Sequence, residues 1–263
     1  MFKASSTTLQ YAHIVARIFI VLGIYFVNLN PYYLIGSMVF YHVFMTIGLS
    51  VMLHRFFSHH SFKFKNKITE YFCTLISILS MRGSPIAWAY IHRYHHEHVD
   101  TEKDPHSPQD KPFKFFGLLD RNKKADQLEI WKIRSLMTRE QIFINQYYWL
   151  IILSVIVPLS ILNFEIFYYF WLLPIVAVQF SINLQNYLGH MPVLFAYTNF
   201  KTKSSGLSQN NMLLWPLYLG EAWHNNHHSH SKHFHYGKEI SGKWWEYDPG
   251  GAFIKLVMKK DIP

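Results

Sequence analysis

Four long apolar segments alternate with polar segments along the chain. They run over Ile14–Phe26 (extending to about Asn30), Tyr32–Leu53, Tyr147–Leu162 and Ile166–Ile182. Short turns at Asn28–Pro31 and Asn163–Glu165 join them in pairs. Each segment approaches the roughly 20 residues that a helix needs to cross a bilayer. The pattern therefore predicts four transmembrane helices in two hairpins.

The distribution of charge orients these hairpins. Neither turn contains Lys or Arg, although the chain has 25 of them, and basic residues favour cytoplasmic loops. We expect a multi-pass integral membrane protein with both termini and the middle loop in the cytoplasm. A soluble bundle of four buried helices is the alternative, but soluble helices usually keep a polar face, and these segments show almost none.

Composition excludes several classes of protein. With 50% hydrophobic residues the chain is too apolar to be disordered, and we expect one domain over residues 1–263. The single cysteine, Cys73, excludes a disulfide framework and any zinc or iron–sulfur site built from several thiolates. The net charge of +9 could indicate nucleic acid as a partner, but no compact basic reading face is evident, and a membrane surface is favoured instead.

Nine histidines follow the spans or lie in the middle loop, all on the predicted cytoplasmic side. In HRYHH and HNNHH they stand at i, i+3 and i+4, which places them on one face of a helix. Ser84 and Pro85 are typical of an N-cap and a first helical residue, so HRYHH is predicted to be helical. The candidate metal ligands are His54, His59, His92, His95, His96, His190, His224, His227 and His228.

His54 and His59 are five residues apart and cannot share one face of an α-helix. They are expected to reach toward different metals, or from a frayed helix end. The other histidines lack comparable spacing and are interpreted as incidental. They are His13, His42, His60, His98, His106, His230, His233 and His235.

Clustered imidazoles indicate metal binding, because protonated rings would repel one another unless a cation kept them neutral. Nine ligands are too many for one ion, so two metals are predicted, and imidazole suits zinc, copper, iron and nickel. His96–Asp100 does not form the HExxH of a zinc protease. A carboxylate di-iron bundle needs two Glu-x-x-His motifs, and only Glu221–His224 fits. A histidine-rich di-iron site in a helical cap at the membrane surface remains.

These motifs carry a resemblance to a known family. HRFFSH, HRYHH followed by DTEKDPHSP, and GEAWHNNHH resemble the three histidine motifs of membrane fatty-acid desaturases, in the Δ9 acyl-CoA and acyl-lipid group that includes stearoyl-CoA desaturase. WAYIHR, NFKTK…QNN and WWEYDPGG are similar to bacterial and cyanobacterial members. The resemblance covers about residues 34 to 250. It implies an all-α membrane fold of four helices with a cytoplasmic di-iron site and an enclosed acyl tunnel.

The resemblance also implies roles for residues. All nine candidate histidines would ligate iron, Asn186 would hold a metal-bound water, and Trp88 would line the tunnel. The implied reaction is the oxygen-dependent insertion of a cis double bond, at Δ9, into a saturated acyl chain. An unactivated methylene gives acid–base or nucleophilic catalysis no starting point, so oxidation is required, and the resemblance implies that two irons, O2 and external electrons supply it.

The implied partners are a fatty acyl-CoA or acyl-lipid substrate, membrane lipid, and a separate electron donor, a ferredoxin or a cytochrome. Asp248–Gly251 resembles the HPGG of haem-binding fusion domains, but an aspartate cannot replace the axial histidine. Many family members carry Trp where Asn183 stands here and Ser where Tyr187 stands. Asn183 is therefore a candidate substrate residue.

Two alternatives remain open. A membrane hydroxylase or ketolase acting on a lipid would use similar histidine clusters. A non-redox metal-binding membrane protein or transporter is the other, but a transporter should place polar ligands near the bilayer midplane, where only His42 is expected.

Overall fold

The computed structural model describes residues 6–105, 130–201 and 207–259, and helices dominate all three stretches. The long helical segments are α1 (Ser6–Gly23), α2 (Pro31–Val43) continued by the π-helix η1 (Phe44–Ser58), α5 (Arg139–Leu162), and α6 (Phe164–Phe167) continued by the π-helix η4 (Tyr168–Leu172) and α7 (Leu173–Leu188). Between the two hairpins lie α3 (Lys67–Leu79), α4 (Pro85–His98) and the 3-10 helix η3 (Ile130–Leu136).

Three helices are long and apolar enough to cross a membrane: Pro31–Ser58, Arg139–Leu162 and Phe164–Leu188. They contain the second, third and fourth predicted spans and extend beyond them. The first predicted span is only partly right, because α1 ends at Gly23 and a turn follows. The apolar part of α1, Thr8–Gly23, is shorter than the other three. Together the long apolar helices indicate an integral membrane protein.

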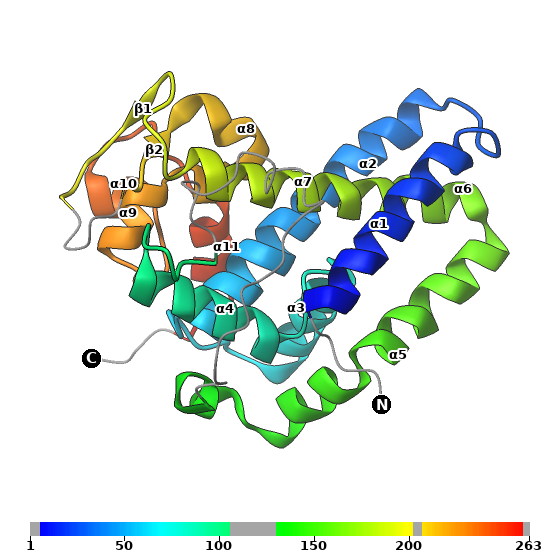
Figure 1. The fold of residues 1–263 in the computed structure, drawn as a ribbon, viewed down its shortest axis with the longest axis horizontal. Coiled ribbons are helices and arrows are strands. Elements are labelled where there is room, and N and C mark those ends of the chain that lie inside the picture. Colours follow the sequence, from blue (N-terminus) through cyan, green and yellow to red (C-terminus); the bar gives the residue numbers. More distant parts are fainter. Residues whose placement is uncertain (1–5, 106–129, 202–206, 260–263) are drawn as a thin grey trace.

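Large apolar side chains are exposed along α1, α2 and α5, which lie at the outside of the molecule (Figure 1). They include Ile18, Val21, Ile35, Met38, Leu153 and Ile161, each between 47% and 78% exposed. Soluble monomers seldom expose apolar surface on this scale. The soluble bundle is therefore disfavoured, and hydrocarbon is the environment that suits these faces.

The turns of the two hairpins lie side by side. The backbone N–H and the side-chain amide of Asn28 both donate to Oε1 of Glu165, at 3.1 and 3.3 Å. The hydroxyl of Tyr169 donates to the carbonyl of Asn28 at 2.8 Å. Asn30 and Asn163 cap the helices that follow the turns by accepting backbone N–H groups. Both hairpins therefore begin their return at the same end of the molecule.

The remaining elements form a cap at the opposite end, gathered on the left of Figure 1. It contains strands β1 (Ala196–Tyr197) and β2 (Asn210–Asn211), which pair antiparallel, and a series of short helices. The helices are η5 (Met212–Leu214), α8 (Trp215–Tyr218), η6 (Leu219–Ala222), α9 (His224–Ser229), α10 (Lys238–Ser241) and α11 (Pro249–Val257). Because η1 and α7 both run into this cap, the ends of the long helices meet the short ones there.

Close packing of α2 against η4 sets the spacing of the hairpins. A Cβ built at Gly36 would lie 2.4 Å from Cε1 of Phe170, so only glycine permits this approach. The hydroxyl of Ser37, one residue later, donates to the carbonyl of Tyr169.

We expect Gly36→Val to destabilise the protein by about 1–3 kcal/mol, because the added side chain overpacks the α2–η4 contact. The measurement is the midpoint of thermal unfolding in detergent. Met38→Val is the matched control, since Met38 lies on the same helix and is 64% exposed. Equal midpoints for the two variants would contradict the close approach.

Candidate metal centre

Four elements bring nine histidines together in the cap. The helix α4 begins as predicted, with Ser84 accepting the N–H of Ala87 at 3.2 Å and Pro85 at the first position. HRYHH lies on α4 and HNNHH on α9, so both motifs are helical as the spacing predicted. His54 and His59 come from the end of η1, and His190 follows α7.

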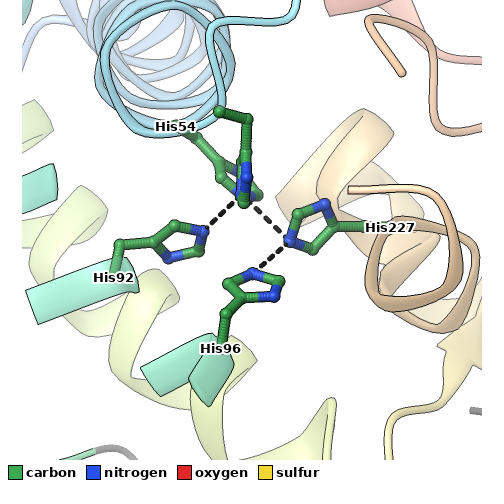
Figure 2. A group of neighbouring side chains, drawn as sticks. His54, His92, His96 and His227 are labelled. Carbon is green, nitrogen blue, oxygen red and sulfur yellow. Dashed lines mark hydrogen bonds between the residues drawn. The ribbon is translucent and has the colours of Figure 1, made fainter. Parts of the chain in front are cut away.

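Five of these side chains form what we call the first histidine group. Its members are His54, His59, His92, His96 and His227, and one ring nitrogen of each lies within 4.8 Å of those of the others. The Nε2 atom of His227 is 3.0 Å from that of His54 and 2.8 Å from that of His96. Figure 2 shows the rings of four members directed toward a common centre.

The other four side chains form the second histidine group. Its members are His95, His190, His224 and His228, whose nitrogens also lie within 4.8 Å of one another. The Nε2 atom of His224 is 2.9 Å from that of His190 and 3.0 Å from that of His228. The helices α4 and α9 each contribute to both groups, which therefore adjoin. The predicted convergence of nine histidines is confirmed.

Of the two expectations for His54 and His59, a reach toward different metals is wrong, because both belong to the first group. The other agrees with the position of His59 at a helix end, as the C-cap of η1. The preceding helix η1 is a π-helix, in which backbone bonds join residues five apart. The N–H of His59 donates to the carbonyl of His54 at 3.2 Å, continuing that pattern. A spacing of five therefore places both side chains on the same side, which an α-helix would not do.

Three carboxylates hold the outer nitrogens of the histidine rings. The Nδ1 atom of His54 lies 2.7 Å from Oε2 of Glu221, and that of His95 lies 2.8 Å from Oδ1 of Asp104. The Nδ1 atom of His190 lies 3.1 Å from Asp100. A carboxylate partner places the ring proton on Nδ1, so Nε2 keeps its lone pair and presents it to the centre of its group.

A buried ion network supports Glu221 in turn. Arg55, fully buried, lies 3.4 Å from Oε1 of Glu221 and 3.1 Å from Oδ2 of Asp248. Burial alone would raise the pKa of Glu221, but the hydrogen bond from Nδ1 of His54 and the charge of Arg55 beside it lower that pKa below its ordinary value. Asp248 also caps α11 by accepting the N–H of Gly251 at 3.0 Å. The Asp248–Gly251 segment is thus a helix cap that holds Arg55.

Six of the nine rings are held neutral by their surroundings. Burial first, and neighbouring histidines second, keep the pKa values of His59, His92 and His96 well below the ordinary value. The same two causes act on His224, His227 and His228 on α9, in that order. Neutral imidazoles with inward lone pairs are the state in which histidine binds a metal ion.

The spacing of the nitrogens fits metal ions. Ligand nitrogens about 2.1 Å from one ion and at right angles to each other would lie about 3 Å apart, close to the 2.7–3.0 Å between the neighbouring Nε2 atoms. Each group consists of histidines alone. Imidazole-only sets suit zinc, copper, iron and nickel, so the chemistry of the donors admits iron and leaves the choice of metal to other observations.

Comparison with known proteins identifies the family. The sequence model described as "Fatty acid desaturase" matches residues 29–238, which include every histidine of both groups. The chain belongs to the fatty acid desaturase family. Members of this family are oxidoreductases, and the resemblance stated from the sequence motifs is confirmed.

Relatives with different named activities are similar to this chain. It is 30% identical to "Acyl-CoA C20 Delta5-desaturase" of Anemone leveillei, over 80% of this chain and 66% of that protein. It is 31% identical to "Delta-9 acyl-lipid desaturase 1" of Arabidopsis thaliana, over 80% and 68% respectively. It is 29% identical to "sn-1 stearoyl-lipid 9-desaturase" of Anabaena variabilis, over 80% and 75%. The chain thus spans about two thirds of the length of the first two.

The other residues predicted for this desaturase family member lie near the groups or on α7. The Trp88 ring stacks on His92 at 6.5 Å between centroids with an interplanar angle of 10°, and it packs against both apolar core clusters. Asn183 accepts a hydrogen bond from Gln179 at 3.1 Å. Asn186 lies on α7 and is half-buried. Their roles stay predictions.

The histidines interpreted as incidental stay outside both groups wherever the structure describes them. His13, for example, bonds to the carbonyl of Met81 at 2.9 Å, and His233 to that of His235 at 2.7 Å. His106 lies outside the described residues.

Sequence reasoning missed the carboxylates that hold the rings. Asp100 and Asp104 are the first and fifth residues of DTEKDPHSP, and Glu221 is the second residue of GEAWHNNHH, so their positions beside the histidine motifs were the available signal. Glu221 fitted the Glu-x-x-His pattern of a metal ligand, yet in the structure it bonds to Nδ1 of His54 instead.

We expect Glu221→Gln to weaken metal binding by the first histidine group about 10- to 100-fold, the usual effect of altering a partner of a ligating histidine. The glutamine side chain lacks the negative charge that faces His54 and Arg55. It has one oxygen where the carboxylate has two, so it cannot accept hydrogen bonds at both positions. Metal content of the purified protein and its competition with a chelator measure the effect. Glu70→Gln, at the Lys67 ion pair on α3, is the control; metal retention like that of this control would contradict the role of Glu221.

Proposed function

We propose that this protein is a membrane acyl desaturase, which holds one iron ion in each histidine group and inserts a cis double bond into a saturated fatty acyl chain. The observation that carries the proposal is the pair of histidine groups, which contain five and four histidines among the described residues. Both groups lie at the cap end of the long apolar helices. Family membership favours iron over the other metals that imidazole binds. We treat residues 1–263 as one domain in this proposal.

The residues of the site have defined tasks in this reaction. Two iron ions reduced by an external donor would supply, with O2, the oxidant that removes two hydrogens from the chain. His54, His95 and His190, with protons held on Nδ1 by carboxylates, present Nε2 to the metals. Asn186 would hold a metal-bound water. Burial of the groups keeps solvent away from the oxidising centre.

The acyl chain would approach the metals beside Trp88. This ring stacks on the ligand His92 and touches both apolar clusters, which suits a wall shared by the metal centre and an apolar tunnel. Asn183, one turn before Tyr187 on α7, would contribute to the same tunnel. Holding the chain in one register relative to the irons would determine which carbons react.

The position of the new double bond is proposed as Δ9. Similarity to the Δ9 acyl-lipid enzyme of Arabidopsis and the stearoyl-lipid 9-desaturase of Anabaena supports it, whereas the Anemone relative is named for Δ5. The substrate class is a fatty acyl-CoA or acyl-lipid, and the electron donor is a separate ferredoxin or cytochrome.

Four membrane helices with a cytoplasmic active site complete the proposal. The two hairpin turns meet at one end through Asn28 and Glu165, and neither turn carries a basic residue. The histidines lie at the other end, in the cap. The end of the molecule that holds the two turns therefore lacks basic residues in its loops. This agrees with the positive-inside rule if the histidines lie on the cytoplasmic side.

The test is expression in a host that has a ferredoxin or comparable donor but no Δ9 desaturase, with a His227→Ala variant as the control. We expect new monounsaturated fatty acids only with the unchanged protein, because His227 belongs to the first histidine group. Mass spectrometry of the total fatty acids gives the amount and position of the double bonds, and bonds at another position would correct Δ9 alone.

Other products would replace the proposal. Hydroxylated chains would identify a hydroxylase. An unaltered fatty-acid profile, with iron bound and the donor working, would indicate a ketolase substrate or a non-redox metal protein.

A further inference from the structure

The short helix α9 carries three of the nine candidate ligands and serves both groups. It has only six residues, and among the described residues no side chain caps its N-terminus. Isolated helices of this length are unstable, so tertiary contacts must hold it. His224, His227 and His228 fall on one face, and at 100° per residue Asn225 and Asn226 fall on the other.

Asn225 is fixed by four hydrogen bonds to the backbone. Its side-chain oxygen accepts the N–H groups of Asn199 and Phe200 at 2.8 and 2.9 Å. Its amide donates to the carbonyls of Phe200 and Ser208 at 3.0 and 3.2 Å. Two acceptances and two donations are the full capacity of an Asn amide, so this side chain cannot turn without losing a bond.

Asn226 is fixed just as completely, but mainly by side chains. Its oxygen accepts from the amides of Asn199 and Asn210 at 2.8 and 2.9 Å. Its own amide donates to the carbonyl of Tyr236 at 2.8 Å and to Oε2 of Glu246 at 2.6 Å. Because the carboxylate of Glu246 can only accept, the amide nitrogen of Asn226 must face it. This orientation of the Asn226 side chain determines which of its four bonds it donates and which it accepts.

Glu246 is the centre of this network and is completely buried. Besides Asn226, it accepts the hydroxyl of Tyr197 at 2.7 Å and the amide of Asn199 at 2.8 Å. Removing it would take the acceptor from three donors, of which the amide of Asn226 lies in the buried interior, and a buried donor left without its acceptor is destabilising. Glu246 therefore fixes Asn199 and Asn226 together, and through them the back of α9.

We propose that Glu246 is a positioning residue for both metal ions, acting through Asn226 to hold α9 with His227 in the first group and His224 and His228 in the second. The proposal rests on the proposed di-iron function. It differs from a simple stabilising role in one respect: loss of the Glu246 acceptor loosens both ions in protein that is still folded.

The substitutions that test it exchange donors for acceptors. In Glu246→Gln one of the two acceptor oxygens becomes an amide nitrogen, which faces either the amide of Asn226 or the donors of Tyr197 and Asn199, so donors meet at one of these two positions. In Asn226→Asp a carboxylate faces Glu246, so two acceptors meet. The double variant Asn226→Asp/Glu246→Gln restores one bond with its direction reversed and keeps the network's total charge, although the carbonyl of Tyr236 loses its donor.

The experiment measures iron per folded chain and the rate at which a chelator removes it, after detergent purification and size-exclusion chromatography. We expect each single variant to release both irons about tenfold faster than the unchanged protein, and the double variant to recover about half of that loss on a logarithmic scale. Glu239→Gln, on the exposed helix α10, should release iron as the unchanged protein does.

Two results would overturn the proposal: unchanged release from Glu246→Gln, or a double variant whose effect is the product of the two single effects. These outcomes are separable from failure of the proposed function. If the unchanged protein itself holds no iron, the di-iron assignment fails. If it holds two irons and the variants release them at its rate, only the role of Glu246 fails.

Discussion

Nine imidazoles packed within two adjoining groups can coexist only if they are neutral and aim their lone pairs inward. One nitrogen of each ring lies within 4.8 Å of those of the other rings in its group, so protonation of several rings would set like charges against one another in a buried space. The structure meets this constraint from outside the groups. Glu221, Asp104 and Asp100 each hold a proton on Nδ1 of one ring, and burial keeps the other rings uncharged.

Holding the rings at fixed angles requires backbones to approach closely behind them. A Cβ at Gly220 would lie 2.0 Å from Oδ1 of Asp248, and a Cβ at Gly189 would lie 3.0 Å from Cδ2 of His224. These glycines allow the hydrogen-bond network of Arg55 and the end of α7 to pack closely against the candidate histidine ligands. The unusual width of η1 serves the same end, because it rotates His59 into the group that already contains His54.

The membrane helices give this centre its rigidity and its isolation. With the hairpin turns joined at one end, the free ends of η1 and α7 converge at the other, where His54 and His190 begin the two groups. The apolar faces of α1 and α5 point outward, so lipid can cover them while polar groups concentrate in the cap. The histidine groups thus lie where the ends of the long apolar helices meet the cap.

The parts of the centre that the sequence predicted are local, and most of the parts that it did not predict are remote, although Asp104 meets His95 only nine residues away. Spacings of three and four residues place HRYHH and HNNHH on helix faces wherever those helices lie, and a Ser-Pro pair starts α4 in any context. In contrast, Asp100 meets His190 ninety residues away and Glu246 meets Asn226 twenty away, so no window of sequence contains both partners. His54 and His59 are close together in the sequence, yet they share a histidine group only because η1 is a π-helix. The 3.6-residue period of an α-helix does not predict this. Ligands repeat a short pattern because one helix must present several of them, whereas supporting residues such as Glu221 and Glu246 stand singly in the sequence and contact residues from several segments. The supporting residues can therefore be identified only from the folded structure.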